Sequence, residues 1–234
     1  QTCSKLFPTE NFAEKGVNEY MQGIPLNERK RLGALLDDRP QTEVMAMIPQ
    51  FSQAETDNFV APPAQIPEAL GVLMFNMERG VNLPEIQEFL RDCPDIQPFD
   101  VILANELDDG CARSGNKNTA RELAQAFGLN YAWGLEFIEL VNDENAKGFH
   151  GNAVFSRWPI RRAGVIRLPE QYNWYFDRQK RIGGRLAVFA ELDVGGQPVG
   201  AVSIHLENRT HGEGRKAQMA AILEAVRKEL PDMP

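Results

Sequence analysis

Residues 70–106 read LGVLMFNMERGVNLPEIQEFLRDCPDIQPFDVILANE. Two apolar runs in this stretch, residues 70–75 and 101–104, have the length of buried strands. The segment between them has a helical apolar pattern, with Asn82 at the capping position and Glu85 at the reciprocal position of a capping box. The pattern therefore predicts a strand, a helix and a second strand in this order.

The rest of the chain continues this alternation and then changes to a hairpin. Gly195-Gly196 lies between two strand-like segments and predicts a hairpin turn. Strands that first alternate with helices and later pair by hairpin indicate an α/β sandwich with a mixed sheet. The further elements that we expect are helices at 120–127 and 219–230 and strands at 131–137, 153–155, 186–192 and 199–206.

The segment before this regular part has a different character. Prolines interrupt residues 1–67 at Pro25, Pro40 and Pro62-Pro63, and only short helical stretches fit between them. We expect an N-terminal extension with short helices over residues 1–67. The main domain is then expected over residues 68–234.

The composition excludes some classes of protein. The chain has 234 residues, of which 43% are hydrophobic and 25% charged, as is ordinary for a soluble globular protein. No apolar run has the length of a membrane span. The net charge of -8 argues against a broad basic surface for nucleic acids. A narrow cationic cleft is compatible with it, because a bound metal ion adds local positive charge.

The cysteines and the first residues leave the compartment open. Cys93 and Cys111 would form a disulfide in an exported protein, or remain unpaired as small apolar residues. The start, Gln1-Thr2-Cys3, has no basic n-region and no apolar h-region, so a signal peptide has either been removed or never existed. Gln1 fits an exported, processed protein and a cloning boundary equally well.

Two polar residues follow the predicted strands of the opening stretch. Asn76 comes after the first strand and Glu106 after the second. Catalytic groups collect at strand ends in α/β folds, because the loops there have a rigid support. A carboxylate and a carboxamide offer the hard oxygen ligands that Mg²⁺ or Mn²⁺ prefers. Each residue alone also fits a simpler reading, a turn former for Asn76 and a solvated side chain for Glu106.

Two histidine-containing segments are the other candidates. His205 lies inside or at the end of an apolar strand and could donate or accept a proton near neutral pH, although a histidine in a strand is more often structural. The segment His150-Gly151-Asn152 fits a loop beside an active cleft or a tight turn that needs small residues. The sequence contains no nucleophile elbow, no P-loop, no dinucleotide fingerprint and no zinc pattern.

Taken in chain order, these segments resemble the successive signatures of the endonuclease/exonuclease/phosphatase family. The resemblance covers roughly residues 70–230 and implies a DNase I-like α/β/β/α sandwich in four layers, of the α/β (α+β) class. Arg185 also matches an arginine at the start of the strand before the histidine strand. The matching segments are Phe75-Asn76, Asn105-Glu106, residues 151–160 (GNAVFSRWPI) and residues 203–207 (SIHLE).

The resemblance also implies roles for these residues. Glu106 would be the main ligand of Mg²⁺ or Mn²⁺, and Asn76 would bind the metal through water or orient the phosphate. His205 would act as the acid near the leaving group or as a donor that orients the phosphate. The residues expected to contact the substrate are Asn208, His150, Asn152 and Arg185.

The chain departs from the family pattern after His205. The family's Gly-Asp-x-Asn and Ser-Asp-His signatures do not follow in this sequence. We therefore expect the chain to supply the N-terminal part of the fold, with a missing C-terminal segment or a second chain carrying Asp-x-Asn and Asp-His to complete it. The least expected alternative is that this half stands alone, since half of the fold would expose a large apolar sheet.

The leading functional hypothesis is a metal-dependent hydrolase of phosphate esters. Its substrate could be a nucleic acid, a phospholipid head group or a small phosphodiester. The alternatives are a non-catalytic binding module on the same fold and one chain of a two-chain enzyme.

Overall fold

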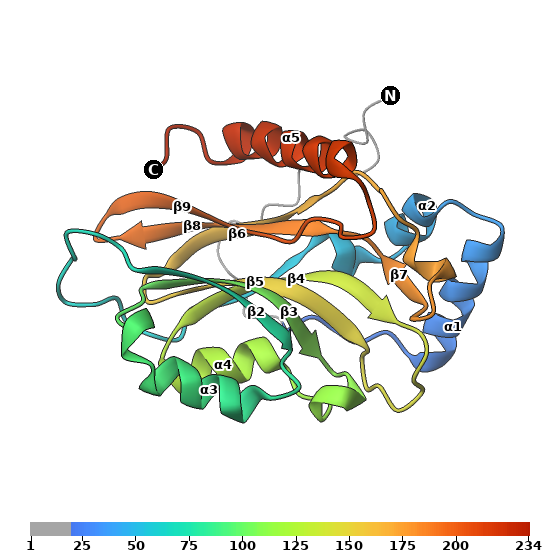
Figure 1. The fold of residues 1–234 in the computed structure, drawn as a ribbon, viewed down its shortest axis with the longest axis horizontal. Helices are drawn as coiled ribbons and strands as arrows, with labels where there is room; N and C mark the ends of the chain where they lie inside the picture. Colours follow the sequence, from blue (N-terminus) through green and yellow to red (C-terminus); the bar gives the residue numbers. More distant parts are fainter. Residues whose placement is uncertain (1–19) are drawn as a thin grey trace.

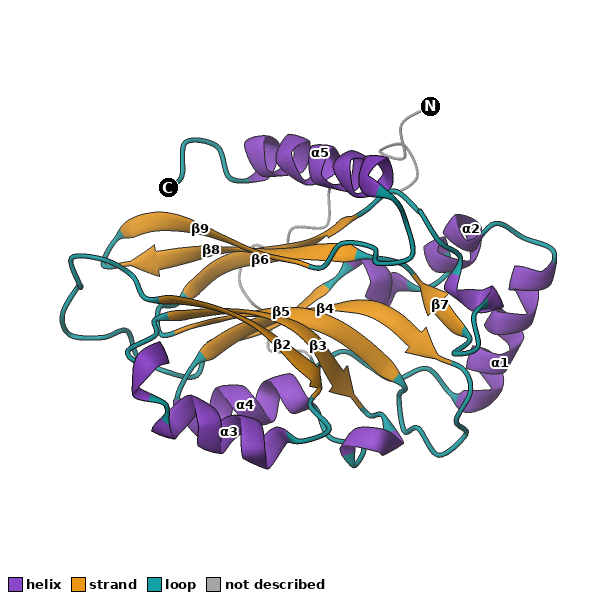
Figure 2. Cartoon of the chain, in the orientation of Figure 1, coloured by secondary structure: helices purple, strands orange, loops and turns teal. Residues whose placement is uncertain are grey.

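The computed structural model describes residues 20–234 and places them in two packed β-sheets with helices on both outer faces (Figures 1 and 2). Among the described residues, no helix is long and apolar enough to cross a bilayer. The helices are α1 (Leu26–Ala34), α2 (Gln41–Ala46), α3 (Leu83–Asp92), α4 (Thr119–Phe127) and α5 (Gly212–Glu229).

The larger sheet has six strands in the order β1-β4-β5-β3-β2, with β7 paired to β4. The smaller sheet has the order β6-β8-β9 and is antiparallel throughout. Among the described strands, only β2 and β3, which are joined through α3, run parallel. The strands are β1 (Ala54–Asp57), β2 (Val72–Arg79), β3 (Val101–Asp109), β4 (Asn130–Glu139), β5 (Phe149–Ser156), β6 (Ile160–Arg167), β7 (Arg181–Gly183), β8 (Leu186–Val194) and β9 (Gln197–Ile204).

The layers follow the order helix, sheet, sheet, helix. Figure 1 shows α3 and α4 on the outer face of the six-stranded sheet and α5 on the outer face of the three-stranded sheet. The expected four-layer α/β/β/α sandwich is therefore confirmed. Local signals explain α4 well: Asn118 caps it by accepting a hydrogen bond from the Arg121 backbone N–H at 2.9 Å, and Gly128 ends it in the left-handed conformation.

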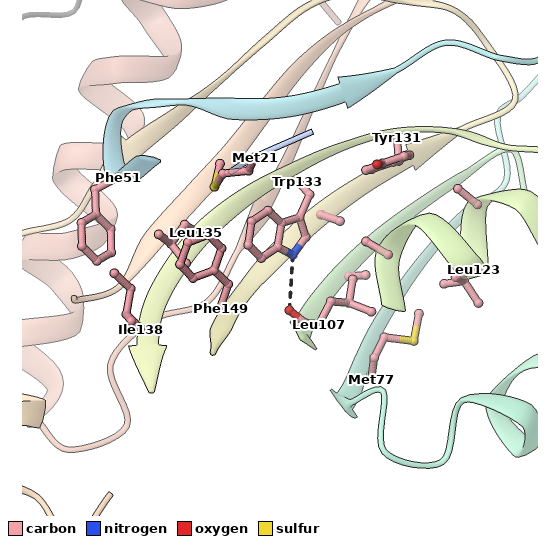
Figure 3. Close-up of a cluster of buried hydrophobic side chains, with 14 of the residues drawn as sticks. Met21, Phe51, Met77, Leu107, Leu123, Tyr131, Trp133, Leu135, Ile138 and Phe149 are labelled. Atoms are coloured by element: carbon pink, nitrogen blue, oxygen red, sulfur yellow. Dashed lines mark hydrogen bonds between the residues drawn. The ribbon is translucent and has the colours of Figure 1, made fainter. Parts of the chain in front are cut away.

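Separate apolar clusters hold the layers together. The largest packs the outer face of the six-stranded sheet against α3, α4 and the segments before β1. Trp133 lies in it with its indole N–H donating to the carbonyl oxygen of Leu107 at 3.3 Å (Figure 3). A second cluster fills the space between the sheets around Val154 and Val188, and a third joins Phe189 of β8 to Ile222 of α5. Because β4 and β5 are central, every residue in them is buried.

Two local expectations about the opening stretch were wrong. β2 is buried on one face only: Val72 is 58% exposed and Met74 78%, because the strands of the smaller sheet lie over β1, β3, β4 and β5. Asn82 occupies the capping position of α3, but its side chain makes no capping hydrogen bond. The predicted helix and both predicted strands are nevertheless present, with β2 and β3 extending beyond the apolar runs.

The part of the predicted extension that the structure describes, residues 20–67, contains α1, α2 and β1. β1 pairs with β4, and Phe51 is fully buried in the largest core cluster, so this segment contributes to the main sheet and core. The domain boundary at residue 67 stays a prediction. Cys93 and Cys111 are free, and Cys3 lies outside the described residues.

Candidate functional site

A β-bulge in β3 directs Glu106 toward the smaller sheet. Ala104 pairs with Ala153 and Leu107 pairs with Gly151, so two residues of β3 face one residue of β5. Glu106 within this bulge has a left-handed backbone, with φ of 59°. In a regular strand the side chains of Glu106 and its neighbour Asn105 would point to opposite faces of the sheet. The bulge lets both side chains point to the same face.

Hydrogen bonds across the bulge confirm this direction. The side chain of Asn105 donates to the carbonyl oxygen of Ile204 at 3.1 Å and accepts from the hydroxyl of Ser203 at 3.2 Å, so it reaches β9. The carboxylate of Glu106 reaches the residue that follows β9: its Oε1 lies 3.8 Å from Nε2 of His205. The two sheets thus bring Glu106 and His205 together although they are far apart in the sequence.

Asn152 supports the bulge from behind. It is fully buried in β5, and its side-chain oxygen accepts the backbone N–H of Glu106 at 3.1 Å. It does not line the cleft described below. Its predicted role as a substrate-binding residue stays a prediction, and the contact that the structure shows holds the backbone of Glu106.

The contacts of His205 determine which ring nitrogen carries the proton. Its Nδ1 lies 3.0 Å from Nη1 of Arg185. A guanidinium can only donate, so Nδ1 accepts and the proton of the neutral ring is on Nε2. Glu136 lies at 3.6 Å from Nδ1, which is beyond hydrogen-bond distance. The N–H of His205 therefore faces Glu106.

Arg185 is held in place by two buried carboxylates. Its Nη1 lies 3.2 Å from Oε1 of Glu136, and its Nε lies 3.4 Å from Oε2 of Glu207. Burial alone would raise the pKa of Glu136, but the charge of Arg185 and the neighbouring histidines lower this pKa to about 2. Glu207 also accepts the indole N–H of Trp174 at 2.8 Å. The orientation of Arg185, and through it that of His205, is fixed by this network.

His150 lies in β5 and not in a loop or tight turn, so both readings of its local structure were wrong. Position 151 requires glycine because of strand packing and not because of a turn: a Cβ there would lie 2.0 Å from the carbonyl oxygen of Gly134 on β4. Nδ1 of His150 donates to Asp108 at 2.8 Å, and Arg113 makes two further hydrogen bonds to that carboxylate. Burial opposes the charge of Asp108, but these partners lower its pKa to about 2.

The two predicted asparagines lie in different surroundings. Asn76 is exposed on β2 beside Asn105, and its side-chain oxygen accepts the backbone N–H of Glu78 at 2.9 Å. It is close to Glu106 in the sheet but does not line the cleft. Asn208 is exposed and does line it. The structure therefore brings His205, Glu106 and Arg185 together, with His150 and Asn208 on the same cleft.

This cleft has a volume of about 470 Å³ and lies beside the Glu106 carboxylate. Five of its lining residues are arginines and two are carboxylates, in a protein whose net charge is -8. A concave site whose charges are mostly of one sign concentrates ligands of the opposite charge. The lining residues are Arg79, Glu106, His150, Trp174, Asp177, Arg178, Gln179, Arg181, Arg185, Asn208 and Arg209.

Several residues of the site were missed in the sequence. Glu136 gave a readable signal, because an acidic residue inside the apolar strand pattern 131–137 must be paired if it is buried. Arg178, Arg181 and Arg185 recur within eight residues, which also distinguishes this segment. Arg79 and Trp174 had no local signal, because only the tertiary fold brings them to the cleft.

The chain matches no protein-family model and no curated protein sequence. It is similar in structure to the human Nocturnin catalytic domain with bound sulfate, with a TM-score of 0.49, 19% identity, and coverage of 77% of this chain and 63% of that one. An endonuclease/exonuclease/phosphatase family protein from Leptotrichia buccalis C-1013-b gives a TM-score of 0.45 and 20% identity, covering 67% of this chain and 63% of that one.

A similar protein from Bacteroides vulgatus, also described as an endonuclease/exonuclease/phosphatase, gives a TM-score of 0.44 and 15% identity, with coverage of 68% and 60%. The chain thus spans less than two thirds of the length of each of these structures. Two of the three carry the name of the family that the motif order resembles.

Proposed function

We propose that this protein hydrolyses phosphate esters with the help of a divalent cation, Mg²⁺ or Mn²⁺. The observation that carries the proposal is the pairing of Glu106 with His205 beside an arginine-lined cleft. A carboxylate, a directed N–H donor and guanidinium groups are the parts that phosphoryl transfer needs, since its catalysis is mostly positioning and charge stabilisation.

The residues present fit the cation. Among residues 20–234 there is no group of three or more His, Cys, Asp or Glu side chains that could hold a metal ion. Mg²⁺, however, keeps several waters and takes one or two carboxylates together with substrate phosphate. Glu106 would hold it with its carboxylate, and Asn76 would contribute its amide oxygen directly or through water. When bound, the cation neutralises charge on the phosphoryl oxygens.

His205 serves best as a hydrogen-bond donor. Nδ1 faces the Arg185 guanidinium at 3.0 Å and accepts from it, so Nε2 is the ring nitrogen that is left to donate. An N–H group directed in this way can orient and stabilise a phosphoryl or leaving-group oxygen. Of the two roles that the motif resemblance implied, the geometry supports the phosphate-orienting donor.

The test is hydrolysis of bis(p-nitrophenyl) phosphate and p-nitrophenyl phosphate with Mg²⁺, with Mn²⁺ and with chelator. Turnover that requires the cation and is lost in Glu106→Gln supports the proposal. Calorimetric titration of Mn²⁺ gives a second readout, because Glu106→Gln should weaken binding whatever the activity. Glu85→Gln, an exposed change on α3, is the matched control.

The alternative is a non-catalytic binding module, which the small number of metal-ligating groups favours. It predicts a folded protein that binds phosphate esters in the cleft and turns none over. A two-chain enzyme is distinguished from it by copurification of a polypeptide that carries Asp-x-Asn and Asp-His. Cation-dependent turnover abolished by Glu106→Gln excludes the binding module.

A further inference from the structure

The arginines of the cleft differ in how far their charge is neutralised. Arg181 and Arg185 are nearly buried and face carboxylates: Nε of Arg181 lies 3.0 Å from Glu139, and Arg185 lies between Glu136 and Glu207. Their guanidinium groups are structural parts of the wall, and much of their charge is compensated from behind. They also flank the ring of Trp174, with guanidinium carbons 5.1 and 5.4 Å from its centre.

Three other arginines keep their charge available to the cleft. Arg79 and Arg178 have no acidic partner within ion-pair distance in the part of the chain that the structure describes. The Nε atom of Arg79 is buried and makes no hydrogen bond there. Arg209 is 56% exposed, and its ion pair with Asp177 is long, at 3.7 Å, and includes no hydrogen bond, so its charge is less compensated than that of Arg181 or Arg185.

These three arginines come from separate segments of the fold. Arg79 follows Asn76 on β2 and pairs with Leu107, the residue after Glu106, so it belongs to the wall that carries the proposed reaction centre. Arg178 lies in the loop before β7, after the 3₁₀ turn Trp174–Phe176, and Arg209 lies in the loop after β9. Asp177 lies next to Arg178 in the chain and faces Arg209, which links these two loops.

We propose that Arg178 and Arg209 form a second anion subsite, which takes a phosphate group other than the one that is hydrolysed. This inference rests on the proposed function, which places the scissile phosphate at Glu106 and His205. The preferred substrate is then a small molecule with at least two phosphate groups. Guanidinium groups suit this ligand because they donate in pairs to phosphate oxygens.

The dimensions and the charge favour a small molecule over a polynucleotide. A volume of about 470 Å³ is that of a site for a small ligand. Long nucleic acids are bound through many phosphate contacts along a basic surface, and the net charge of -8 opposes this. Apart from Trp174, the lining residues are polar, so the cleft suits a hydrophilic, charged compound.

Binding of a matched set of probes tests the proposal. Glucose 1,6-bisphosphate, glucose 1-phosphate and glucose 6-phosphate share one sugar and differ in the number of phosphates. Their dissociation constants are measured by calorimetry with EDTA and constant ionic strength, so neither cation nor turnover takes part. The same titration with a twelve-residue oligothymidine tests the polynucleotide.

The variant is Arg178→Gln with Arg209→Gln, two changes at exposed side chains. The control is Arg91→Gln with Arg227→Gln, exposed residues at the ends of α3 and α5 that make the same change in net charge. We expect the bisphosphate to bind at least about 10-fold more tightly than either monophosphate. This advantage should fall below about 3-fold in the variant and persist in the control.

Equal affinity for bisphosphate and monophosphates would overturn the second subsite. An advantage that survives in Arg178→Gln/Arg209→Gln would overturn its assignment to these arginines. Oligothymidine binding as tightly as the bisphosphate would overturn the small-molecule class. Failure of the proposed function is separate, because it appears as missing cation-dependent turnover and not as a change in binding with EDTA.

Discussion

Nε2 of His205 lies 3.8 Å from Oε1 of Glu106, and the two side chains come from different sheets of the sandwich. Glu106 reaches this position through the bulge in β3, and His205 through the end of β9. Arg185 fixes the other ring nitrogen of His205. The contact between Glu106 and His205 therefore depends on the packing of the two sheets. It also depends on Arg185, whose guanidinium occupies Nδ1 and leaves the N–H of Nε2 facing Glu106.

Replacing His205 should show whether this residue acts as a hydrogen-bond donor or only as a structural residue. His205→Ala should lower kcat by about 10²–10³, the usual loss for one donor to a transition-state oxygen. His205→Gln, which keeps an N–H donor, should retain about tenfold more activity than His205→Ala. The measurements are kcat with bis(p-nitrophenyl) phosphate and the midpoint of thermal unfolding.

The fold should tolerate these changes, because Arg185 keeps its two carboxylate partners and His205 is only partly buried. His211→Ala, at an exposed position before α5, is the matched control and should not change kcat. If His205→Ala unfolds the protein, His205 is structural. Equal activity of the Ala and Gln variants would count against the donor role.

The backbone of Glu106 should carry measurable strain. A residue other than glycine in the left-handed region is disfavoured, and Glu106 has φ of 59°. Glu106→Gly should therefore be more stable than Glu106→Ala by about 1 kcal/mol, measured by urea unfolding. Both variants should lose Mn²⁺ binding equally. The same pair of changes at Glu122, inside α4, should show the opposite order, because glycine weakens a helix.

The sequence predicted the elements whose signals are local. The β8–β9 hairpin around Gly195-Gly196 and the end of α4 at Gly128 were predicted correctly, because turn and cap residues act within a few positions. β1, β6 and β7 were not recognised. β1 and β7 are short and pair with β4, a remote strand, whereas β6 pairs with β8.

The candidate site likewise combines residues that local sequence indicated with features that depend on tertiary structure. Glu106 and Asn76 were indicated by their positions after predicted strands, and His205 by the apolar strand that it ends. The bulge could not be predicted, because it is a mismatch in register between β3 and β5 rather than a property of either sequence. The free arginines of the cleft were likewise unpredictable, since pairing with an acid depends on tertiary contacts. The roles of the individual residues stay predictions.

Acid should destabilise the protein through two buried carboxylates. The pKa values of Asp108 and Glu136 are lowered to about 2 from ordinary values of 3.8 and 4.5. Because the pKa values of these groups are higher in the unfolded chain, the unfolded chain takes up protons first as the pH falls. The contribution of the two carboxylates to the free energy of unfolding is therefore complete above about pH 4.5 and is lost between about pH 4.5 and 2. The loss is about 2–3 kcal/mol for each group.

Urea unfolding between pH 2 and 7 measures this contribution. Glu136→Gln should lower stability at pH 7 and make the decline below pH 4.5 shallower than in the unmodified protein. Glu28→Gln removes an exposed carboxylate that pairs with Arg31 on α1 and should change the decline much less, because water screens this pair. A decline equally steep in Glu136→Gln would show that Glu136 does not contribute in this pH range.

Gly151 should connect the stability of the sandwich to the site. Its added Cβ would lie 2.0 Å from the backbone oxygen of Gly134 and 2.7 Å from the ring of Trp133, so β4 and β5 would have to separate. Gly151→Ala should therefore lower the free energy of unfolding by at least about 2 kcal/mol. It should also weaken Mn²⁺ binding, because Gly151 precedes Asn152, which holds the bulge of Glu106. Gly212→Ala, whose Cβ would meet no atom within 4 Å, should leave both unchanged; a Gly151→Ala protein as stable as this control would contradict the close packing of β4 on β5.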